Sequence, residues 1–254
     1  MNDVTVRQSN KLLDAMPAAV RARLNESLCL VELPLGKVLY EAGETMQYVY
    51  FPADAIVSLL YVMEDGASAE ISVVGNEGLV GISVFMGGGS TSSRAVVQSG
   101  GHGLRLPVSR LRLEFERSAE VRLLLLRYTQ ALITQMAQTA VCNRHHTIDQ
   151  QLCRWLLLSL DRLPSNRLTM TQELIANMLG VRREGVTEAA RKLQKAKVIE
   201  YSRGKITILD RRKLESLCCE CYQVVKSETD RLLPEARPTV KELIARSPSP
   251  QCSV

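Results

Sequence analysis

The spacing of apolar residues changes at Pro107, and this change most limits what the chain can fold into. From Leu33 to Leu106, apolar runs with a period of two alternate with glycine-containing turns, a pattern typical of an antiparallel, jelly-roll-like β-roll. After Pro107 the period becomes three to four, which indicates helices. The sequence therefore predicts an α+β fold with the sheet at its N-terminal end. We expect a helix over residues 10–30 and strands over 37–40, 48–51, 56–62, 69–73 and 95–97.

Residues 118–143 contain neither glycine nor proline, so we expect one long helix there, after a short helix over 108–115. A helix of roughly 25 residues spans about 38 Å, more than one small barrel can cover. Its apolar stripe is either an ordinary core face or a seam between two copies of the chain, and we favour the seam. The residues expected in this dimer contact are Leu125, Tyr128, Leu132, Met136 and Thr139.

Ala176, Gly180 and Val186 have the relative spacing of a tight helix-turn-helix. A small side chain lets the two helices cross closely, and glycine adopts the positive φ of the turn. The apolar residue holds the second helix against the first. Thr169 or Thr171 is expected to cap the first helix. A helical hairpin used only for packing is the alternative interpretation.

The outward face of the second helix, which begins near Arg182, would enter the major groove of double-stranded DNA. Arg183 and Glu184 are expected to read bases, because arginine can bond guanine O6 and N7 and glutamate can accept from cytosine N4. A basic ribbon over 198–201 and 205–209 follows and would contact phosphates. The expected DNA contacts are Thr169, Thr171, Gln172, Arg182, Arg183, Glu184, Thr187, Glu188, Arg191, Arg203 and Lys205.

Positive charge is concentrated in the same segment. The formal net charge of the whole chain is only +5. Residues 147–213 hold 14 Lys and Arg against 7 Asp and Glu, whereas residues 1–118 hold 10 against 13. A basic module beside an acidic one is typical of a nucleic-acid-binding domain joined to another domain, although a solvated basic face would give the same count.

Other classes of function lack the residues they would need. The sequence has no Gly-rich phosphate loop, no His-Glu-x-x-His motif and no nucleophile elbow, so we do not expect an enzyme. No apolar run approaches the roughly 20 residues that cross a bilayer, and the first ten residues are polar. We therefore expect a soluble, cytoplasmic protein without membrane contact.

The seven cysteines have irregular spacing, which favours reduced thiols over a disulfide framework. Cys218, Cys219 and Cys221 are close in sequence, but neighbouring positions diverge on a helix, so no metal site is expected. We interpret them as buried small residues, with a redox switch as the alternative. His145 and His146 are expected to make a hinge contact, because zinc would need more ligands.

From about residue 10 to 225 the chain resembles the Crp/Fnr family of bacterial transcription regulators. The resemblance rests on two sets of motifs. They are Leu35-Gly-Lys37, Glu41-Ala-Gly-Glu44, Phe51-Pro52 and Glu64-Asp-Gly66 in the β-rich part, and Leu179-Gly-Val-Arg-Arg-Glu184 and Leu193-Gln-Lys-Ala-Lys-Val-Ile199 in the basic part. The resemblance implies an effector-sensing β-roll, a dimerisation helix and a winged helix-turn-helix on a two-fold symmetric DNA site. It also implies RNA polymerase and a small-molecule effector as partners.

The resemblance is weakest where cyclic-nucleotide members of that family hold their ligand. Those members carry a Gly-Glu pair for the ribose and an Arg-Ser-Ala run for the phosphate, whereas this chain has Gly81-Ile82 and Ser93-Arg94. Ile82 cannot accept a hydrogen bond, and a shift by one residue turns Arg94 to the opposite face of a strand. These four residues are the expected effector contacts, Arg94 being the candidate for an anionic ligand, and the cofactor stays unknown.

The sequence thus predicts a homodimeric, sequence-specific DNA-binding transcription regulator. The alternative is a cyclic-nucleotide-type or thiol-redox sensor that acts mainly through protein contacts. The expected parts are a β-roll sensor over 1–117, a dimerisation helix over 118–146, a winged helix-turn-helix over 147–225 and a tail over 226–254.

Overall fold

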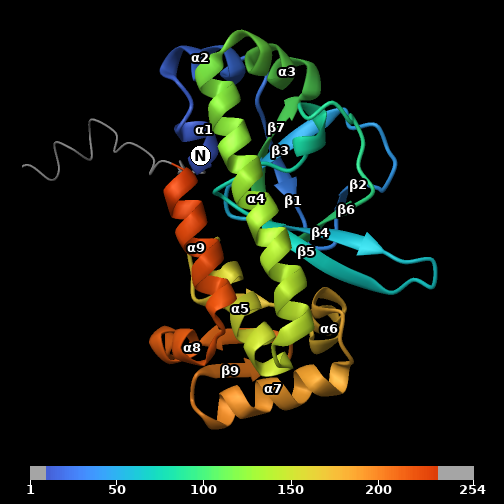
Figure 1. Ribbon diagram of the computed structural model, residues 1–254, viewed down its shortest axis with the longest axis vertical. Helices are drawn as coiled ribbons and strands as arrows, with labels where there is room; N and C mark the ends of the chain where they lie inside the picture. Colours follow the sequence, from blue (N-terminus) through green and yellow to red (C-terminus); the bar gives the residue numbers. More distant parts are fainter. Residues whose placement is uncertain (1–9, 234–254) are drawn as a thin grey trace, which may run out of the picture.

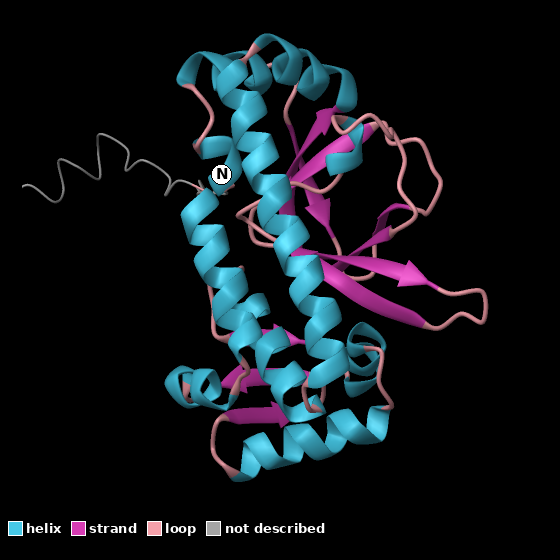
Figure 2. Ribbon diagram, viewed as in Figure 1, coloured by secondary structure: helices cyan, strands magenta, loops and turns pink. Residues whose placement is uncertain are grey.

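A β-rich part and a helical part lie at opposite ends of one long helix, α4 (Ala119–His145), in the computed structural model, which describes residues 10–233 (Figure 1). A second helix, α9 (Glu220–Leu232), packs alongside α4. Figure 2 shows that the strands form a large group beside the upper half of α4 and a small group beside its lower end. The α+β architecture expected from the sequence is confirmed.

The β-rich part is a roll of two antiparallel sheets. The first has the order β1-β7-β3 and the second the order β2-β6-β4-β5. A single bridge, between Tyr50 and Val80, adds to the first sheet. The strands are β1 (Cys29–Leu33), β2 (Val38–Tyr40), β3 (Tyr48–Pro52), β4 (Ile56–Val62), β5 (Ser68–Val74), β6 (Arg94–Ser99) and β7 (Gly101–Pro107), with a short 3-10 helix, η1 (Ile82–Val84), after β5.

Two strands of the roll were not expected from the sequence. The expected helix over 10–30 is two helices, α1 (Lys11–Asp14) and α2 (Ala18–Asn25), and it is wrong at its C-terminal end, where β1 begins at Cys29. Only one side chain of β1 is buried, so its apolar pattern is weak. The signal of β7 is masked by two glycines, one of which, Gly103, lies so close to Leu33 and the backbone of Phe51 that any larger side chain would collide with them.

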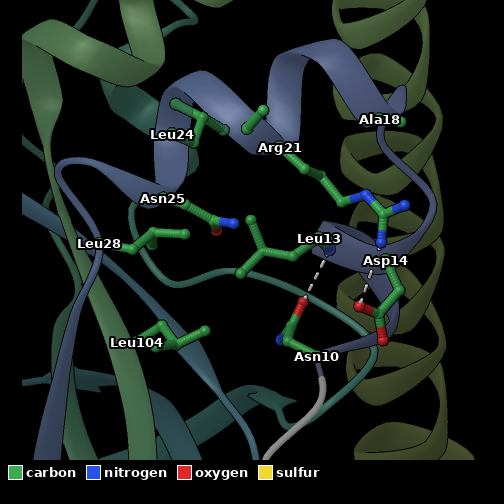
Figure 3. Close-up of a pocket in the computed structure, with 10 residues that line it drawn as sticks. Asn10, Leu13, Asp14, Ala18, Arg21, Leu24, Asn25, Leu28 and Leu104 are labelled. Atoms are coloured by element: carbon green, nitrogen blue, oxygen red, sulfur yellow. Dashed lines mark hydrogen bonds and ion pairs between the residues drawn. The ribbon is translucent and has the colours of Figure 1, made fainter.

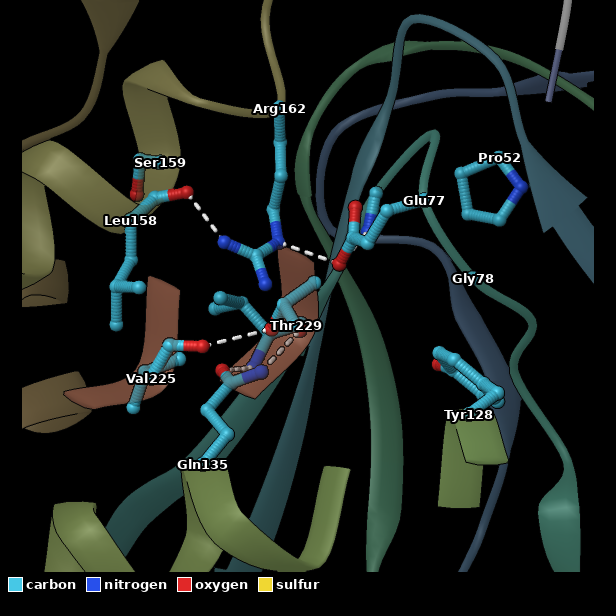
Figure 4. Close-up of polar contacts among 12 residues, drawn as sticks. Pro52, Glu77, Gly78, Tyr128, Gln135, Leu158, Ser159, Arg162, Val225 and Thr229 are labelled. Carbon is cyan, nitrogen blue, oxygen red and sulfur yellow. Dashed lines mark hydrogen bonds and ion pairs between the residues drawn. The ribbon is translucent and has the colours of Figure 1, made fainter. Parts of the chain in front are cut away.

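The apolar stripe of α4 packs on the roll of the same chain. Leu125, Tyr128 and Leu132 are almost completely buried, and the Tyr128 hydroxyl donates to the carbonyl of Leu79 at 2.9 Å. The side-chain amide of Gln135 accepts from Val73 N at 2.9 Å and donates to Val73 O at 3.1 Å (Figure 4). The stripe is therefore the core face of the helix, the alternative that the sequence left open. The expected dimer contact through Leu125, Tyr128, Leu132, Met136 and Thr139 is corrected accordingly: four of these side chains are buried and Met136 packs against the same core.

The helical part follows α3 (Val108–Arg117) and α4 in the chain and contains a three-stranded antiparallel sheet with the order β8-β10-β9. Its elements are α5 (Ile148–Leu160), β8 (Arg167–Thr169), α6 (Gln172–Leu179), α7 (Arg183–Lys195), β9 (Ile199–Ser202), β10 (Lys205–Ile208) and α8 (Arg211–Leu217), followed by α9. The expected start of a tail at residue 226 falls inside α9, where Tyr222 and Val225 are buried in the core of this part. The expected tail beyond 233 lies outside the described residues.

Strands β4 and β5 contribute side chains to the hydrophobic cores of both parts. Ile56, Leu60 and Val73 belong to the core of the helical part, although they stand on strands of the roll. A buried ion pair also crosses the boundary: Arg162 Nε donates to Glu77 Oε1 at 2.7 Å (Figure 4). The roll and the helical part are thus packed together over a wide contact rather than joined only by α4.

A chain of buried polar groups lies at the same boundary. The Ser58 hydroxyl is 2.5 Å from the Glu70 carboxyl and 2.7 Å from Oε1 of Gln98, and Gln98 donates to the Ser159 hydroxyl at 3.4 Å. Ser58 has only one hydrogen to donate, so a protonated Glu70 that donates to Ser58 lets every step of the chain have a donor. Burial raises the pKa of Glu70 from 4.5 to about 7, an effect larger than the opposing influences of Ser58 and Arg154.

This burial predicts a pH dependence of stability. Between about pH 4.5 and 7 the folded chain keeps the Glu70 proton that the unfolded chain loses, so the free energy of unfolding falls as the pH rises through this range. Glu70→Gln removes that loss. At about pH 8 it should raise the free energy of unfolding by up to about 3 kcal/mol, and with it the Tm. Thermal unfolding across this pH range tests it. The exposed Glu64→Gln is the matched control, and an equal effect of the two substitutions would contradict the prediction.

Candidate functional site

The helix-turn-helix expected from the sequence is formed by α6 and α7. The Thr171 hydroxyl caps α6 by accepting from Leu174 N at 3.2 Å, so Thr171, not Thr169, is the N-cap. Gly180 ends the helix in the left-handed region, with a φ of 64°. Ala176 and Val186 are buried where the two helices cross. All three residues of the motif therefore do what their spacing predicted.

The helix α7 turns a polar face to solvent. Arg182 is its N-cap residue, and Arg183, Glu184, Glu188 and Arg191 are exposed along it. The opposite face, with Val186, Ala189, Ala190 and Leu193, is buried. The residues expected to read bases thus lie on a free surface of the described chain.

Two contacts orient this face from its sides. The Thr187 hydroxyl donates to Gln172 Oε1 at 2.7 Å, which links α7 to the start of α6. Lys192 Nζ lies 2.9 Å from Asp149 Oδ2 and 3.3 Å from Glu188 Oε1. The carboxylate of Glu188 would repel a phosphate, and Lys192 offsets part of its charge. Lys192 is a polar contact of this surface that the sequence analysis did not identify, although its i,i+4 spacing from Glu188 was a usable signal.

The ribbon β9-β10 places further cations near the start of α6. Arg203 and Gly204 form its turn with φ values of 50° and 76°, as a tight type I′ hairpin requires. Lys205 pairs with Thr169 of β8 across the sheet, and Met170 N donates to the carbonyl of Gly204 at 2.6 Å. The structure therefore brings Thr169, Arg203 and Lys205 together at the edge of the helix-turn-helix.

The roll contains a small cavity next to α4, with a volume of about 90 Å³. Three of the four expected effector contacts, Gly81, Ile82 and Ser93, line it. Arg94 does not: its Nη2 lies 3.1 Å from Glu41 Oε1, outside the lining. The expectation that Arg94 receives an anionic ligand here is therefore corrected, because strand alternation turns Arg94 away from Ser93. The remaining lining residues, which the sequence analysis missed, are Tyr40, Leu59, Tyr61, Ile71, Leu79, Ser83, Thr91, Leu132 and Met136.

The chemistry of this cavity is apolar with a few hydroxyl groups. Its lining includes no lysine or arginine, so nothing there would neutralise a phosphate. Sites for molecules of drug or cofactor size usually enclose about 300–1,000 Å³. Leu132 and Met136 come from α4, so whatever fills the cavity touches the long helix directly.

A larger depression, of about 380 Å³, lies between α1, α2 and Leu104 (Figure 3). The polar groups of Asn10 at its edge are already bonded: Oδ1 accepts from Leu12 N and Leu13 N, and Nδ2 donates to the carbonyls of Pro52 and Gly78. Arg21 lies 3.9 Å from Asp14 on the other side. Asn10 thus secures α1 to the roll, and we assign the depression no role.

One cluster of metal-ligating side chains lies where the sequence led us to expect no metal site. Cys142 and His146 at the end of α4 meet Cys219 and Cys221 at the start of α9, and their ligand atoms all lie within 4.8 Å of one another. Cys219 is the N-cap of α9 and has extended backbone, so the divergence expected of a helix does not apply. Burial raises the pKa of the Cys142 thiol, and raises that of Cys221 to about 12.

Comparisons with known proteins agree with this architecture. Residues 30–118 match the cyclic nucleotide-binding domain family, and residues 150–217 match the Crp-like helix-turn-helix domain family. No curated protein matches the sequence. None of the helices in the described part of the chain is both long and apolar enough to cross a bilayer.

Solved structures with the same fold include several bacterial regulators. A Crp/Fnr-family regulator from Eubacterium rectale has a TM-score of 0.64 and 19% identity, over 81% of this chain and 96% of that one. FixK2 from Bradyrhizobium japonicum has a TM-score of 0.62 and 16% identity, over 76% and 98%. CLP from Xanthomonas campestris, a c-di-GMP responsive global regulator, has a TM-score of 0.60 and 14% identity, over 76% and 100%.

The two domains and their order define a protein with the architecture of a transcriptional regulator. The chain belongs to the Crp/Fnr family. Neither matched domain is an enzymatic one.

The cavity predicts how the roll responds to cyclic nucleotides. Because the cavity is small and lacks a cation, cyclic AMP, cyclic GMP and cyclic di-GMP should leave the Tm of the purified chain unchanged. Differential scanning fluorimetry with increasing nucleotide measures this. A saturable rise in Tm that Ser93→Ala abolishes would contradict the prediction, since it would show that the cavity opens to admit the nucleotide.

Proposed function

We propose that this protein is a cytoplasmic transcription regulator that binds a specific double-stranded DNA sequence as a homodimer. The observation that carries the proposal is the exposed polar face of α7, with Arg182, Arg183 and Glu184 at its first turn. In a helix-turn-helix, the N-terminal residues of the second helix are the ones that reach base edges in the major groove. Their exposure and the burial of the opposite face support this orientation.

Phosphate contacts come from the edge of the same surface. Thr169 ends β8, Thr171 and Gln172 lie at the start of α6, and Arg203 and Lys205 lie on the adjacent ribbon. Thr187 and Arg191 continue the outward face of α7, and Glu188 lies between them. Such contacts set the position of the protein on the duplex, while Arg183 and Glu184 read the bases.

Dimerisation uses the face of α4 that the roll leaves free. Leu123, Leu126, Ile133 and Val141 on this face are about half exposed. Leu123, Leu126, Gln130, Ile133 and Ala137 follow one another at alternating steps of three and four residues, the period of a two-stranded coiled coil. The cavity lies against the opposite face of α4, so a small effector in it would act on the helix that joins the two copies. Once bound to DNA, the dimer would act through RNA polymerase.

The DNA contact is tested with Arg183→Ala on a duplex obtained by in vitro selection from random sequence. We expect a loss of about 1–3 kcal/mol on the selected duplex and a relaxed base preference at one position. Lys205→Ala should instead weaken binding to all duplexes alike and lower the salt dependence, because it removes only a phosphate contact. Fluorescence anisotropy with labelled duplexes measures both.

Arg110→Ala, at an exposed position on α3, is the matched control and should bind like the unmodified chain. Failure of the unmodified chain to bind any duplex at low salt would overturn the proposed function. It would favour instead a sensor that acts through protein contacts.

The dimer contact is tested with Leu126→Glu. A charge at the centre of the apolar seam should convert the dimer to a monomer and weaken binding to the two-fold symmetric site at least tenfold. Sedimentation velocity measures the association state. Leu113→Glu on α3 is the control, because Leu113 is 45% exposed and Leu126 48% exposed. A monomeric unmodified chain, or an equal effect of both substitutions, would contradict the seam.

A further inference from the structure

Three thiols and one imidazole meet where α4 ends and α9 begins. The Cys142 and Cys219 Sγ atoms are 3.6 Å apart, and the Cys221 Sγ atom is 3.6 Å from Nδ1 of His146. The three cysteines are buried and His146 is half-buried. These residues come from segments more than 70 positions apart in the chain, and the fold alone brings them together.

The donor set selects one class of ion. Thiolate sulfur is a poor ligand for Mg²⁺ and Ca²⁺, which prefer oxygen, and a good one for Zn²⁺. Three cysteines and one histidine form a closed four-ligand set of the kind found in structural zinc sites. A Zn–S distance of about 2.3 Å in a tetrahedron separates the ligand atoms by about 3.8 Å, close to the two separations that the cluster shows.

The surroundings of the cluster also fit a bound cation. His146 Nε2 lies 3.4 Å from Glu220 Oε1, so the ring is held by a carboxylate while Nδ1 faces the thiols. This is the usual outer contact of a histidine that binds zinc. Gln151 Nε2 donates to the His146 carbonyl at 3.0 Å and holds the backbone at the turn between α4 and α5.

A buried arginine, Arg154, lies near the cluster and carries a positive charge. It is 3% exposed, and its Nη1 donates to the Thr139 hydroxyl at 3.0 Å, one turn before Cys142 on α4. Its Nε atom is buried without a hydrogen-bond partner among the described residues. Three thiolates around a divalent ion leave one net negative charge, which a buried arginine beside them balances. Burial of this guanidinium is costly without an anion nearby, and metal-bound thiolates would add to the charge that the Glu70 carboxyl offers it.

We propose that Cys142, His146, Cys219 and Cys221 bind one Zn²⁺ ion, which ties α9 to the C-terminal end of α4. The proposed metal site lies beside the turn between α4 and α5, where the long helix is followed by the helix-turn-helix domain. The metal therefore adds to the packing of β4 and β5 in fixing the angle of this domain to α4. Its loss leaves α9 held by side-chain packing and by the hydrogen bond from the Tyr222 hydroxyl to Asp161.

The test uses the purified full chain. Mass spectrometry of metals should find about one zinc per chain, and a thiol-specific mercurial should release it. After exchange, Co²⁺ should give the visible absorption of a tetrahedral site and thiolate-to-cobalt charge-transfer bands. Neither measurement requires a variant that still folds. Zinc removal by a chelator should lower the Tm, and added Zn²⁺ should restore it.

Matched variants locate the ion. His146→Ala and Cys219→Ser should lose the zinc and the cobalt spectrum, while His145→Ala and Cys29→Ser, at exposed positions outside the cluster, should keep both. A chain that binds no zinc when purified under reducing conditions, or His146 and Cys219 variants that keep their metal, would overturn the site. A disulfide between Cys142 and Cys219 in that purified protein would overturn it as well, in favour of a redox pair.

An effect on DNA binding rests on the proposed function. Removal of zinc should weaken binding of the dimer to its selected duplex at least tenfold, because two recognition helices at variable angles no longer match two successive grooves. Zinc binding is read independently by the cobalt spectrum, so failure of the DNA contact and failure of the metal site give different results.

Discussion

The packing of α4 against the β-roll is the contact on which the other relations in this molecule depend. Tyr128 and Gln135 bond to the backbone of the roll at Leu79 and Val73, so the rotation of the helix about its axis is set by hydrogen bonds as well as by apolar packing. With that face occupied, the exposed apolar side chains of α4, among them Leu126 and Ile133, lie on the opposite face. The C-terminal end of α4 then determines where the helix-turn-helix begins.

Patterns within one element were enough to predict much of this fold. The two periodicities on either side of Pro107, the absence of helix breakers in α4 and the Ala176, Gly180, Val186 spacing all report local structure, and the structure contains each of them. The strands β1 and β7 were missed because their local signals are poor. β1 has one buried side chain, and the glycines of β7 are required by neighbours that the sequence does not place beside it.

The candidate sites differ in the same way: features set by neighbouring residues could be predicted, and features that join residues far apart in the chain could not. The outward face of α7 follows from one helical period and could be predicted. The partner of the α4 stripe could not, since a core face and a dimer seam have the same sequence pattern. The cavity joins Ile71 to Leu132, and the cysteine cluster joins Cys142 to Cys219; such pairs become neighbours only through the topology. The expectation of no metal site rested on a helical Cys219, whereas Cys219 precedes α9 with extended backbone.

The two faces of strand β4 pack into the hydrophobic cores of two different domains. Val57 and Leu59 point into the roll, while Ile56 and Leu60 point into the core of the helix-turn-helix domain. Because side chains alternate along a strand, the insertion of a single residue would exchange the two sets and damage both interiors at once. Changes in chain length should therefore be tolerated in the exposed turn between β4 and β5 and not within the strand. The two domains therefore have to evolve along β4 as one unit.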